Sequence, residues 1–389
     1  MTENSPIFTS VFITGHVASA LIAALSCIVL YLTLKKLVSN QIAIISTCIF
    51  AFATATWSIS SQALWQHGIA ELLLILMIYL IVRNEEVPSS SNMVGLGLLA
   101  GLFIFNRPPD AVLLIPVLGY IIFRYRNRLR YFLAAGIVSG IPFLVYNYCI
   151  FGNIFGGYIN NLSLFHLDWQ FWSSYLALLV SPSRGLFIYS PVLVLSIIGY
   201  FRLDTIKNQN IAAMLRWFGP VILFDILVYS LFYDWKGGYC FGPRFLTGML
   251  PVLVIFLAVF LEVFRNSRLS APKKQCISAF ILMLVILSVI IQVIGVFCFP
   301  FIIDIDTPPD RIWNIENNQI ARSYADGAKN ITSVSVLLLP PLPRVLLYSG
   351  GNESLTKIYA NESEFQNYPK SPPQSDWNYR NSSKEGTVY

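Results

Sequence analysis

The chain has 389 residues, of which 56% are hydrophobic and only 12% are charged. Soluble domains carry about 25% charged residues, so the composition excludes a soluble globular protein, a disordered chain, a collagen-like fibre and a coiled coil. The net charge of +6 would suit a nucleic-acid partner, but most basic residues fall in short loops between apolar runs, and we expect no nucleic acid to bind.

Ten apolar runs follow one another along the sequence, separated by charged or Pro/Gly-rich segments. A membrane-spanning helix needs about 20 mostly apolar residues, and these solid blocks differ from the alternating pattern of a membrane β-barrel. The sequence therefore predicts an all-α polytopic membrane bundle of about ten transmembrane or re-entrant helices. The runs are 7–34, 41–60, 67–82, 93–105, 111–123, 131–150, 186–201, 214–233, 245–264 and 276–299.

Two neighbouring runs, 93–105 and 111–123, are short for a membrane span. At 1.5 Å per residue each reaches about 20 Å, against a hydrocarbon core of about 30 Å. They fit either two short spans or a re-entrant hairpin. In both cases the start of the first run and the end of the second lie on the cytoplasmic side. In either arrangement the turn between them can lie below the outer surface, inside protein or against a watery cavity.

Basic residues predict the orientation of the bundle, because cytoplasmic loops carry an excess of Lys and Arg. Lys35 and Lys36 follow the first run, which places the N-terminus outside. Alternation then assigns most short-loop cations to the cytoplasmic side: Lys35, Lys36, Arg83, Arg124, Arg126, Arg128, Arg130, Arg202, Lys207, Arg216, Arg265, Arg268, Lys273 and Lys274. The opposite short loops hold Arg107, Arg184, Lys236 and Arg244. We expect a multi-pass cell-membrane protein with its N-terminus and C-terminal tail outside.

The predicted organisation is a multi-pass transmembrane domain at 1–299 and an extracytoplasmic tail at 300–389. The tail is rich in Pro, Asn, Ser and Tyr, and we expect it to be mostly irregular. Glycosylation sequons of the form N-x-S/T all fall on the predicted outer side, at Asn161, Asn330, Asn352, Asn361 and Asn381.

The cysteines and histidines give no metal-binding pattern. The six cysteines form no CxxC pair and mostly lie in or beside apolar runs, which predicts buried apolar thiols. With only three histidines in the chain, we predict no metal-ligating residues. The use of a divalent cation as a cofactor is left open.

Two polar clusters lie on the predicted outer side in the first half of the chain. His67 and Glu71 share a helix face, and the cluster at 58–71 either anchors a helix end or contacts a substrate. In the turn 106–110, Arg107 and Asp110 can form a structural lock. The alternative is a guanidinium presented to an anion, a role for which Arg is well suited.

Two further clusters lie in later outer loops. The loop 151–185 is rich in aromatic residues and fits either an interfacial aromatic belt or a surface for a sugar ring or polyprenyl chain. The loop 234–244 contains three glycines and a proline, which let the backbone approach a ligand closely. Lys236 and Arg244 add two cations there, and the alternative is a simple tight turn. A lipid-linked phosphate or pyrophosphate would require such cations at the outer interface.

Five stretches of sequence carry a family resemblance. They are TWSISSQALWQHG (56–68), NRPPD (106–110), YNYCIFGNIFGGY (146–158), SPSRGLFIYSP (181–191) and WKGGYCFGPRFL (235–246). Over roughly residues 10–320 the chain resembles the GT-C class of polytopic glycosyltransferases, near the mannosyltransferase/aminoarabinose-transferase-like branch. This resemblance implies a transferase that uses a polyprenyl-phosphate-linked sugar outside the membrane and passes it, with inversion, to a glycan, lipid or protein acceptor.

The chain departs from this class at its beginning. In the class, the proposed catalytic base is an Asp or Glu on the first outer loop, between the first two helices. Here the first helix resembles the second helix of the class, so we expect a chain that lacks the N-terminal helix and the acidic loop. The resemblance thus implies a truncated or inactive member, or a hexosyltransferase-type enzyme if the missing acidic loop is supplied upstream.

The sequence leads to a specific set of candidate site residues. The candidate catalytic carboxylates are Asp168 and Asp110. The candidate substrate-binding residues are Arg107, Arg184, Lys236, Arg244, His67 and Tyr239. The expected partners are the polyprenyl-phosphate sugar lipid, membrane lipids and the acceptor. The alternative functions are a non-catalytic membrane scaffold and a polyprenyl-phosphate lipid transporter.

Overall fold

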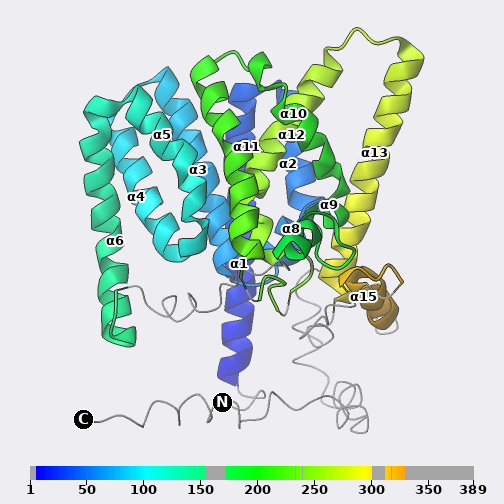
Figure 1. The fold of residues 1–389 in the computed structure, drawn as a ribbon, viewed down its shortest axis with the longest axis horizontal. Coiled ribbons are helices and arrows are strands. Elements are labelled where there is room, and N and C mark those ends of the chain that lie inside the picture. The colour runs from blue at the N-terminus through cyan, green and yellow to red at the C-terminus, as the bar shows by residue number, and fades with distance from the viewer. Residues whose placement is uncertain are drawn as a thin grey trace. The chain divides into compact units, whose positions relative to one another are not determined.

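The protein is a bundle of α-helices, described from a computed structural model (Figure 1). The structure describes residues 6–154, 171–232, 234–238, 240–299, 312–316 and 318–328, with side chains from residue 13 onward. No strand occurs in these ranges. The chain divides into one unit at Thr14–Thr332 and a second made of Met1–Ile13 and Ser333–Tyr389. Of the second unit only the start of the first helix is described, and the rest of this section concerns Thr14–Thr332.

The ten predicted apolar runs are mostly helical, and the run 186–201 is divided among three short helical segments. The α-helices are α1 (Pro6–Leu37), α2 (Asn40–Phe52), α3 (Gln66–Glu86), α4 (Ser90–Asn106), α5 (Ile115–Arg124), α6 (Leu129–Phe151), α8 (Phe171–Val180), α9 (Leu186–Tyr189), α10 (Val194–Tyr200), α11 (Gln209–Ser230), α12 (Leu250–Arg265), α13 (Ala271–Val293) and α15 (Gln319–Ala328). Short 3₁₀ or π segments extend or join them: η1 (Thr56–Ser60), η2 (Pro108–Leu114), η3 (Arg126–Arg128), η5 (Pro191–Leu193), η6 (Leu203–Thr205), η7 (Arg244–Met249) and η8 (Ile294–Cys298).

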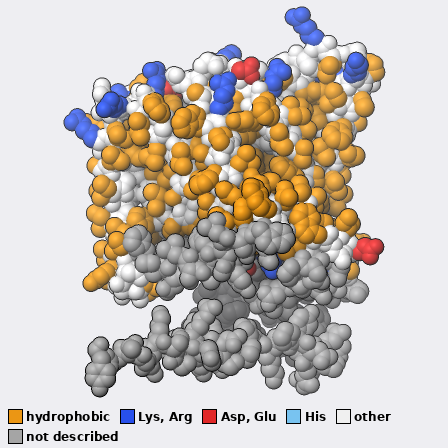
Figure 2. All heavy atoms as spheres, viewed as in Figure 1, with side chains coloured by type: hydrophobic (Ala, Val, Ile, Leu, Met, Phe, Trp, Pro, Cys, Tyr) orange, Lys and Arg blue, Asp and Glu red, His pale blue; other side chains and the backbone are white. Residues whose placement is uncertain are grey.

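Six of the helical segments in the described ranges are long and apolar enough to cross a bilayer: Ile13–Leu37, Gln66–Glu86, Arg126–Phe151, Gln209–Ser230, Arg244–Arg265 and Ala271–Cys298. Shorter apolar helices accompany them, including α8, which the sequence analysis did not single out. Apolar side chains dominate the face drawn in Figure 2, and basic side chains gather along one edge of it. The predicted all-α polytopic bundle is therefore confirmed.

The short pair of runs in the first half folds as two limbs joined by η2. Pro108 and Pro109 stop α4, so the return begins as a 3₁₀ segment and becomes α-helical only at Ile115. With rises of 2.0 Å and 1.5 Å per residue, the seven residues of η2 and the ten of α5 reach about 29 Å. Whether this pair forms two short spans or a re-entrant hairpin stays a prediction.

Close packing of α4 against α6 depends on glycine. A Cβ on Gly97 would collide with the carbonyl oxygen of Phe132, and one on Gly101 would lie 2.5 Å from the carbonyl oxygen of Gly136 and collide with Ser139. Gly97 and Gly101 are four residues apart and therefore share a helix face. Small residues at this spacing let two helix backbones approach closely inside a membrane. The two glycines therefore allow α6 to pack directly against α4.

Polar contacts tie together the helix ends that carry the excess of basic residues. The carboxylate of Glu85 accepts hydrogen bonds from Asn208 and Asn210 at 3.0 Å each and from the hydroxyls of Tyr120 and Tyr125. Burial, together with the Glu85 carboxylate, raises the pKa of Tyr125, so this tyrosine stays a neutral donor. We call this the basic end of the bundle.

An ion pair and a serine hydrogen bond add further links at the basic end. Lys36 Nζ lies 2.6 Å from Glu86 Oε2, and the backbone N–H of Ser39 donates to Glu262 at 3.0 Å. The loops after α1, α3, α5, α10 and α12 therefore meet at the end predicted to be cytoplasmic. Which side of a membrane this end faces remains a prediction.

Part of the predicted tail is ordered. The helix α15 lies within 300–389, a region predicted to be mostly irregular, and it packs against η8. The division at residue 299 stays a prediction. Most of the tail, the five sequons and the loop residues 155–170 lie outside the described residues.

Candidate functional site

A glycine-rich loop after α11 organises the end of the bundle opposite the basic end, which we call the site end. Gly237, Gly238 and Gly242 have φ values of 79°, 60° and 78°, a left-handed region that side chains with a Cβ rarely adopt. Gly242 also packs on Tyr189, where a Cβ would lie 2.5 Å from the ring. The glycines therefore permit a compact loop that a different sequence could not form.

Arg184 and Gln319 support this loop through hydrogen bonds to its backbone. Arg184 is 1% exposed, and its Nη1 donates to the carbonyl oxygen of Cys240 at 2.8 Å and to Oε1 of Gln319 at 2.7 Å. The same Gln319 oxygen accepts from the Tyr189 hydroxyl at 2.8 Å and from the Gly242 amide at 2.7 Å. The Gln319 amide nitrogen donates to Cys240 at 2.8 Å. These contacts make Arg184 a buried support of the loop.

Arg107 and Asp110 form a buried ion pair under the loop. Arg107 Nη1 lies 2.9 Å from Asp110 Oδ2, and the two side chains are 4% and 1% exposed. The second oxygen of Asp110 accepts from the Tyr229 hydroxyl, whose ring lies 4.8 Å from the Arg107 guanidinium carbon. This geometry is that of a structural lock. A general base must reach the acceptor hydroxyl, so the predicted catalytic role of Asp110 would require the pair to open.

Arg244, at the end of the glycine-rich loop, is partly exposed. Its guanidinium carbon lies 4.4 Å from the Trp65 ring and 5.4 Å from the Phe245 ring, distances typical of cation–π contacts. Its Nε is buried without a hydrogen-bond partner among the described residues. His67, which is 5% exposed, has its ring centroid 6.0 Å from that of Phe245. Arg244 thus keeps hydrogen-bonding capacity beside two aromatic rings.

The cations of the predicted outer loops come together at this end. Arg107 and Arg184 both act electrostatically on Arg244, as does the exposed carboxylate of Asp234. Lys236 is partly buried on the same loop. Their segments are far apart in the sequence, so the folding of the bundle creates the cluster. The candidates Asp168 and Tyr239 lie outside the described residues.

Comparison with known families supports the resemblance seen in the sequence. The sequence model of the dolichyl-phosphate-mannose-protein mannosyltransferase family matches residues 5–146. This match covers just over a third of the chain and supports a GT-C glycosyltransferase-like protein. The matched segment includes His67, Arg107 and Asp110, whereas Arg184 and Arg244 lie beyond it. A comparison with curated proteins finds no match to this chain.

The site of this glycosyltransferase-like protein includes two residues that the sequence did not single out. Gln319 lies in the part expected to be an irregular tail, and its partners are up to 135 residues away. A signal for it was available, because Ile320, Tyr324 and Ala328 recur at helical spacing in a stretch free of proline. Trp65 lies within the predicted cluster at 58–71, but its stacking on Arg244 depends on two segments that only the fold brings together.

Two further carboxylates are buried near the site end. Glu71 lies one turn after His67 in α3, as expected, and its Oε1 accepts from the hydroxyl of Ser60 at 2.7 Å. Asp225 is 1% exposed, one helical turn before Tyr229, and neither of its oxygens has a hydrogen-bond partner in the described part of the chain. Within the described ranges, no three His, Cys, Asp or Glu side chains lie close enough together to hold a metal ion. The use of a divalent cation stays open.

Proposed function

We propose that this membrane glycosyltransferase-like protein uses a polyprenyl-phosphate-linked sugar as donor and acts at the outer face of the membrane. The observation that carries the proposal is the partly exposed Arg244, whose guanidinium carbon lies 4.4 Å from the Trp65 ring. It lies on a glycine-rich loop at the end of the bundle remote from the basic loops. A phosphate at the membrane surface would find a cation there, with room for its lipid tail in the bilayer.

The four cations have different roles in this proposal. Arg244 and Lys236 contact the donor phosphate, because both are partly exposed on one loop. Arg184 and Arg107 are buried and bound to protein groups. They therefore contribute positive potential at the site without contacting the donor phosphate. His67 and Tyr239 contact the sugar or the acceptor. Arg is well suited to the first role because its planar guanidinium matches phosphate geometry.

The proposed reaction is an inverting displacement at the anomeric carbon. The acceptor hydroxyl oxygen forms a bond to that carbon while the bond from the carbon to the phosphate oxygen breaks, and the phosphate leaves with the electron pair. A carboxylate takes the hydroxyl proton, and Asp168, with Asp110 as the second candidate, is proposed for this role. Arg244 offsets the charge that develops on the leaving phosphate, which is the usual source of large rate effects in such sites.

The orientation and the class of acceptor are part of the same proposal. Positive-inside bias assigns the basic end to the cytoplasm, which puts Arg244 outside. The name of the matching family refers to transfer of mannose from a dolichyl phosphate to protein. We therefore propose a hexosyl donor and, among the glycan, lipid and protein acceptors, a protein acceptor as the first to test.

The test is transfer of a radiolabelled sugar from polyprenyl-phosphate hexose to acceptor in membranes that contain the full chain. Arg244→Gln should lower the rate about 100- to 1,000-fold, as when a preorganised charge-stabilising donor is removed. Arg268→Gln, at an exposed position of the basic end, is the matched control and should leave the rate unchanged. Equal rates for wild type and Arg244→Gln would refute the assignment of this site.

The non-catalytic alternatives make a different prediction. A scaffold would show no transfer in the wild type and no protection of the loop 234–243 from hydrogen exchange when polyprenyl phosphate is added. A lipid transporter would protect the loop but move the lipid across vesicles without any sugar transfer. Protection together with transfer supports the glycosyltransferase.

A further inference from the structure

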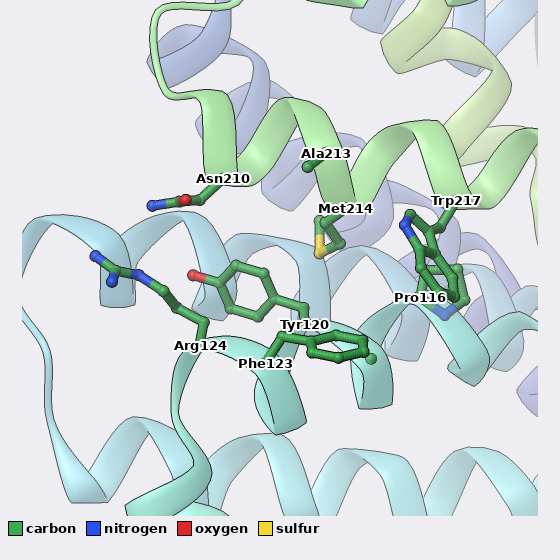
Figure 3. A pocket seen from close by; sticks show the side chains of 9 residues that line it. Pro116, Tyr120, Phe123, Arg124, Asn210, Ala213, Met214 and Trp217 are labelled. Atoms are coloured by element: carbon green, nitrogen blue, oxygen red, sulfur yellow. The ribbon is translucent and has the colours of Figure 1, made fainter.

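A separate groove lies at the basic end, between α5 and α11, and is shown in Figure 3. Its volume is about 200 Å³, below the roughly 300–1,000 Å³ of sites that enclose a whole small molecule. The groove is therefore suited to one segment of a longer ligand. It is remote from the glycine-rich loop, because α5 and α11 meet there through the residues that surround Glu85.

The two ends of the groove differ in polarity. Figure 3 shows Phe123 and Trp217 at one end, with Arg124 and Asn210 at the other beyond the Tyr120 hydroxyl. The rings of Phe123 and Trp217 are 6.3 Å apart, and these residues are 80% and 50% exposed. The large exposed aromatic residues at one end match the apolar acyl chain of a phospholipid, and the cation at the other end matches its phosphate.

Charge around the polar end of the groove is predominantly positive. Arg124 remains 55% exposed although its Nε lies 3.5 Å from Glu85, a carboxylate that already accepts from several other groups. Arg126 is exposed on η3, two residues after Arg124. Arg128 on the same segment has a buried Nη1 without a hydrogen-bond partner among the described residues. The polar end of the groove therefore presents a mostly exposed guanidinium, with two further arginines next to it in the sequence.

We propose that this groove binds an anionic glycerophospholipid, with part of an acyl chain between α5 and α11 and the phosphate at Arg124 and its neighbouring arginines. Basic pockets between helices on the cytoplasmic side of membrane proteins recognise anionic head groups in this way. The aromatic residues lie where Trp and Tyr usually meet the membrane interface. The site is independent of sugar transfer. The bound lipid would stabilise the packing of α5 against α11.

Fluorescence quenching tests the proposal because Trp217 lines the groove. The full chain is reconstituted in phosphatidylcholine vesicles that contain increasing amounts of brominated phosphatidylglycerol or, in a parallel series, brominated phosphatidylcholine. The signal of Trp217 is the difference between wild type and Trp217→Phe. Phosphatidylglycerol should reach half-maximal quenching at a mole fraction about fivefold lower, the preference given by one basic side chain near an anionic surface.

Two variants and a control separate the parts of the site. Arg124→Gln should remove the preference for phosphatidylglycerol, whereas Arg202→Gln, exposed at the same end, should keep it. Gly119→Leu should reduce quenching by both lipids, because a Cβ at Gly119 meets nothing within 4 Å and the added side chain extends into the groove. Inorganic phosphate in excess should not displace the lipid.

The comparison of the two brominated lipids, made on the Trp217 signal, decides the proposal without relying on the Arg124 or Gly119 variants. Equal quenching by the two brominated lipids would overturn it. An unchanged preference in Arg124→Gln would also overturn it, since the phosphate would then bind elsewhere. Displacement by inorganic phosphate would show a site for a free anion, which contradicts binding of a lipid.

Discussion

Replacing Asp110 by Asn tests whether Arg107 is a structural lock or a cation offered to a ligand. The two groups are 2.9 Å apart and almost fully buried, and the substitution would leave the Arg107 charge without its partner. Removing one member of a buried ion pair costs about 3–5 kcal/mol. We expect Asp110→Asn and Arg107→Met each to lower the free energy of unfolding by about that amount.

The double variant Arg107→Met/Asp110→Asn provides the decisive comparison. It leaves no buried charge unpaired, and replacing both members of such a pair is often close to neutral. The Tyr229 hydroxyl can still donate to the amide oxygen of an Asn at position 110. We therefore expect the double variant to lie within about 1 kcal/mol of wild type, so that the pair shows strong coupling.

The assay is reversible unfolding in mixed detergent micelles, followed by circular dichroism, for wild type, both single variants and the double variant. Lys36→Met gives a matched control, because the Lys36–Glu86 pair is 28% and 52% exposed and should contribute at most about 1 kcal/mol. Sugar transfer is measured on the same samples. If Arg107→Met abolishes transfer while the stability of both single variants stays unchanged, the lock is wrong and Arg107 serves the ligand.

Two further predictions concern the packing of the bundle and the support of the glycine-rich loop. Gly101→Leu should destabilise the protein by at least about 1–3 kcal/mol, because its Cβ would collide with Ser139; Gly15→Ala, where a Cβ meets nothing within 4 Å, should have little effect in the same melting experiment. Gln319→Leu should speed hydrogen exchange at the Gly242 amide, which loses its acceptor at 2.7 Å, and unchanged exchange would contradict the supporting role of Gln319.

The helical membrane architecture was accessible from the sequence because it depends on local properties. A long apolar run must satisfy its backbone hydrogen bonds internally in lipid, which makes a helix the expected structure wherever such a run occurs. The ten runs and the division of basic residues between loops follow from this alone. The start of α5 was placed too early, since the 3₁₀ segment after Pro108 and Pro109 delays the α-helix to Ile115.

Individual roles within the site were less accessible from the sequence. Arg107, Arg184 and Arg244 have the same side chain and all lie beside apolar runs, so the sequence could group them but not rank them. Their burial and partners differ: Arg107 pairs with Asp110, Arg184 is buried and donates to a backbone carbonyl, and Arg244 is partly exposed beside an aromatic ring. The Arg107–Asp110 pair is local, whereas the contacts of Arg184 with Cys240 and of Arg244 with Trp65 join segments more than 50 residues apart.

The sequence by itself determined that this chain is an apolar helical bundle with a few cations in the polar loops of its less basic end, because hydropathy and charge act residue by residue. Only the tertiary structure decided which of these cations is partly exposed beside an aromatic ring and which residues support its loop. Gln319 and Trp65 entered the site for this reason alone, since the packing of α15 and of the segment before α3 brings them to the glycine-rich loop.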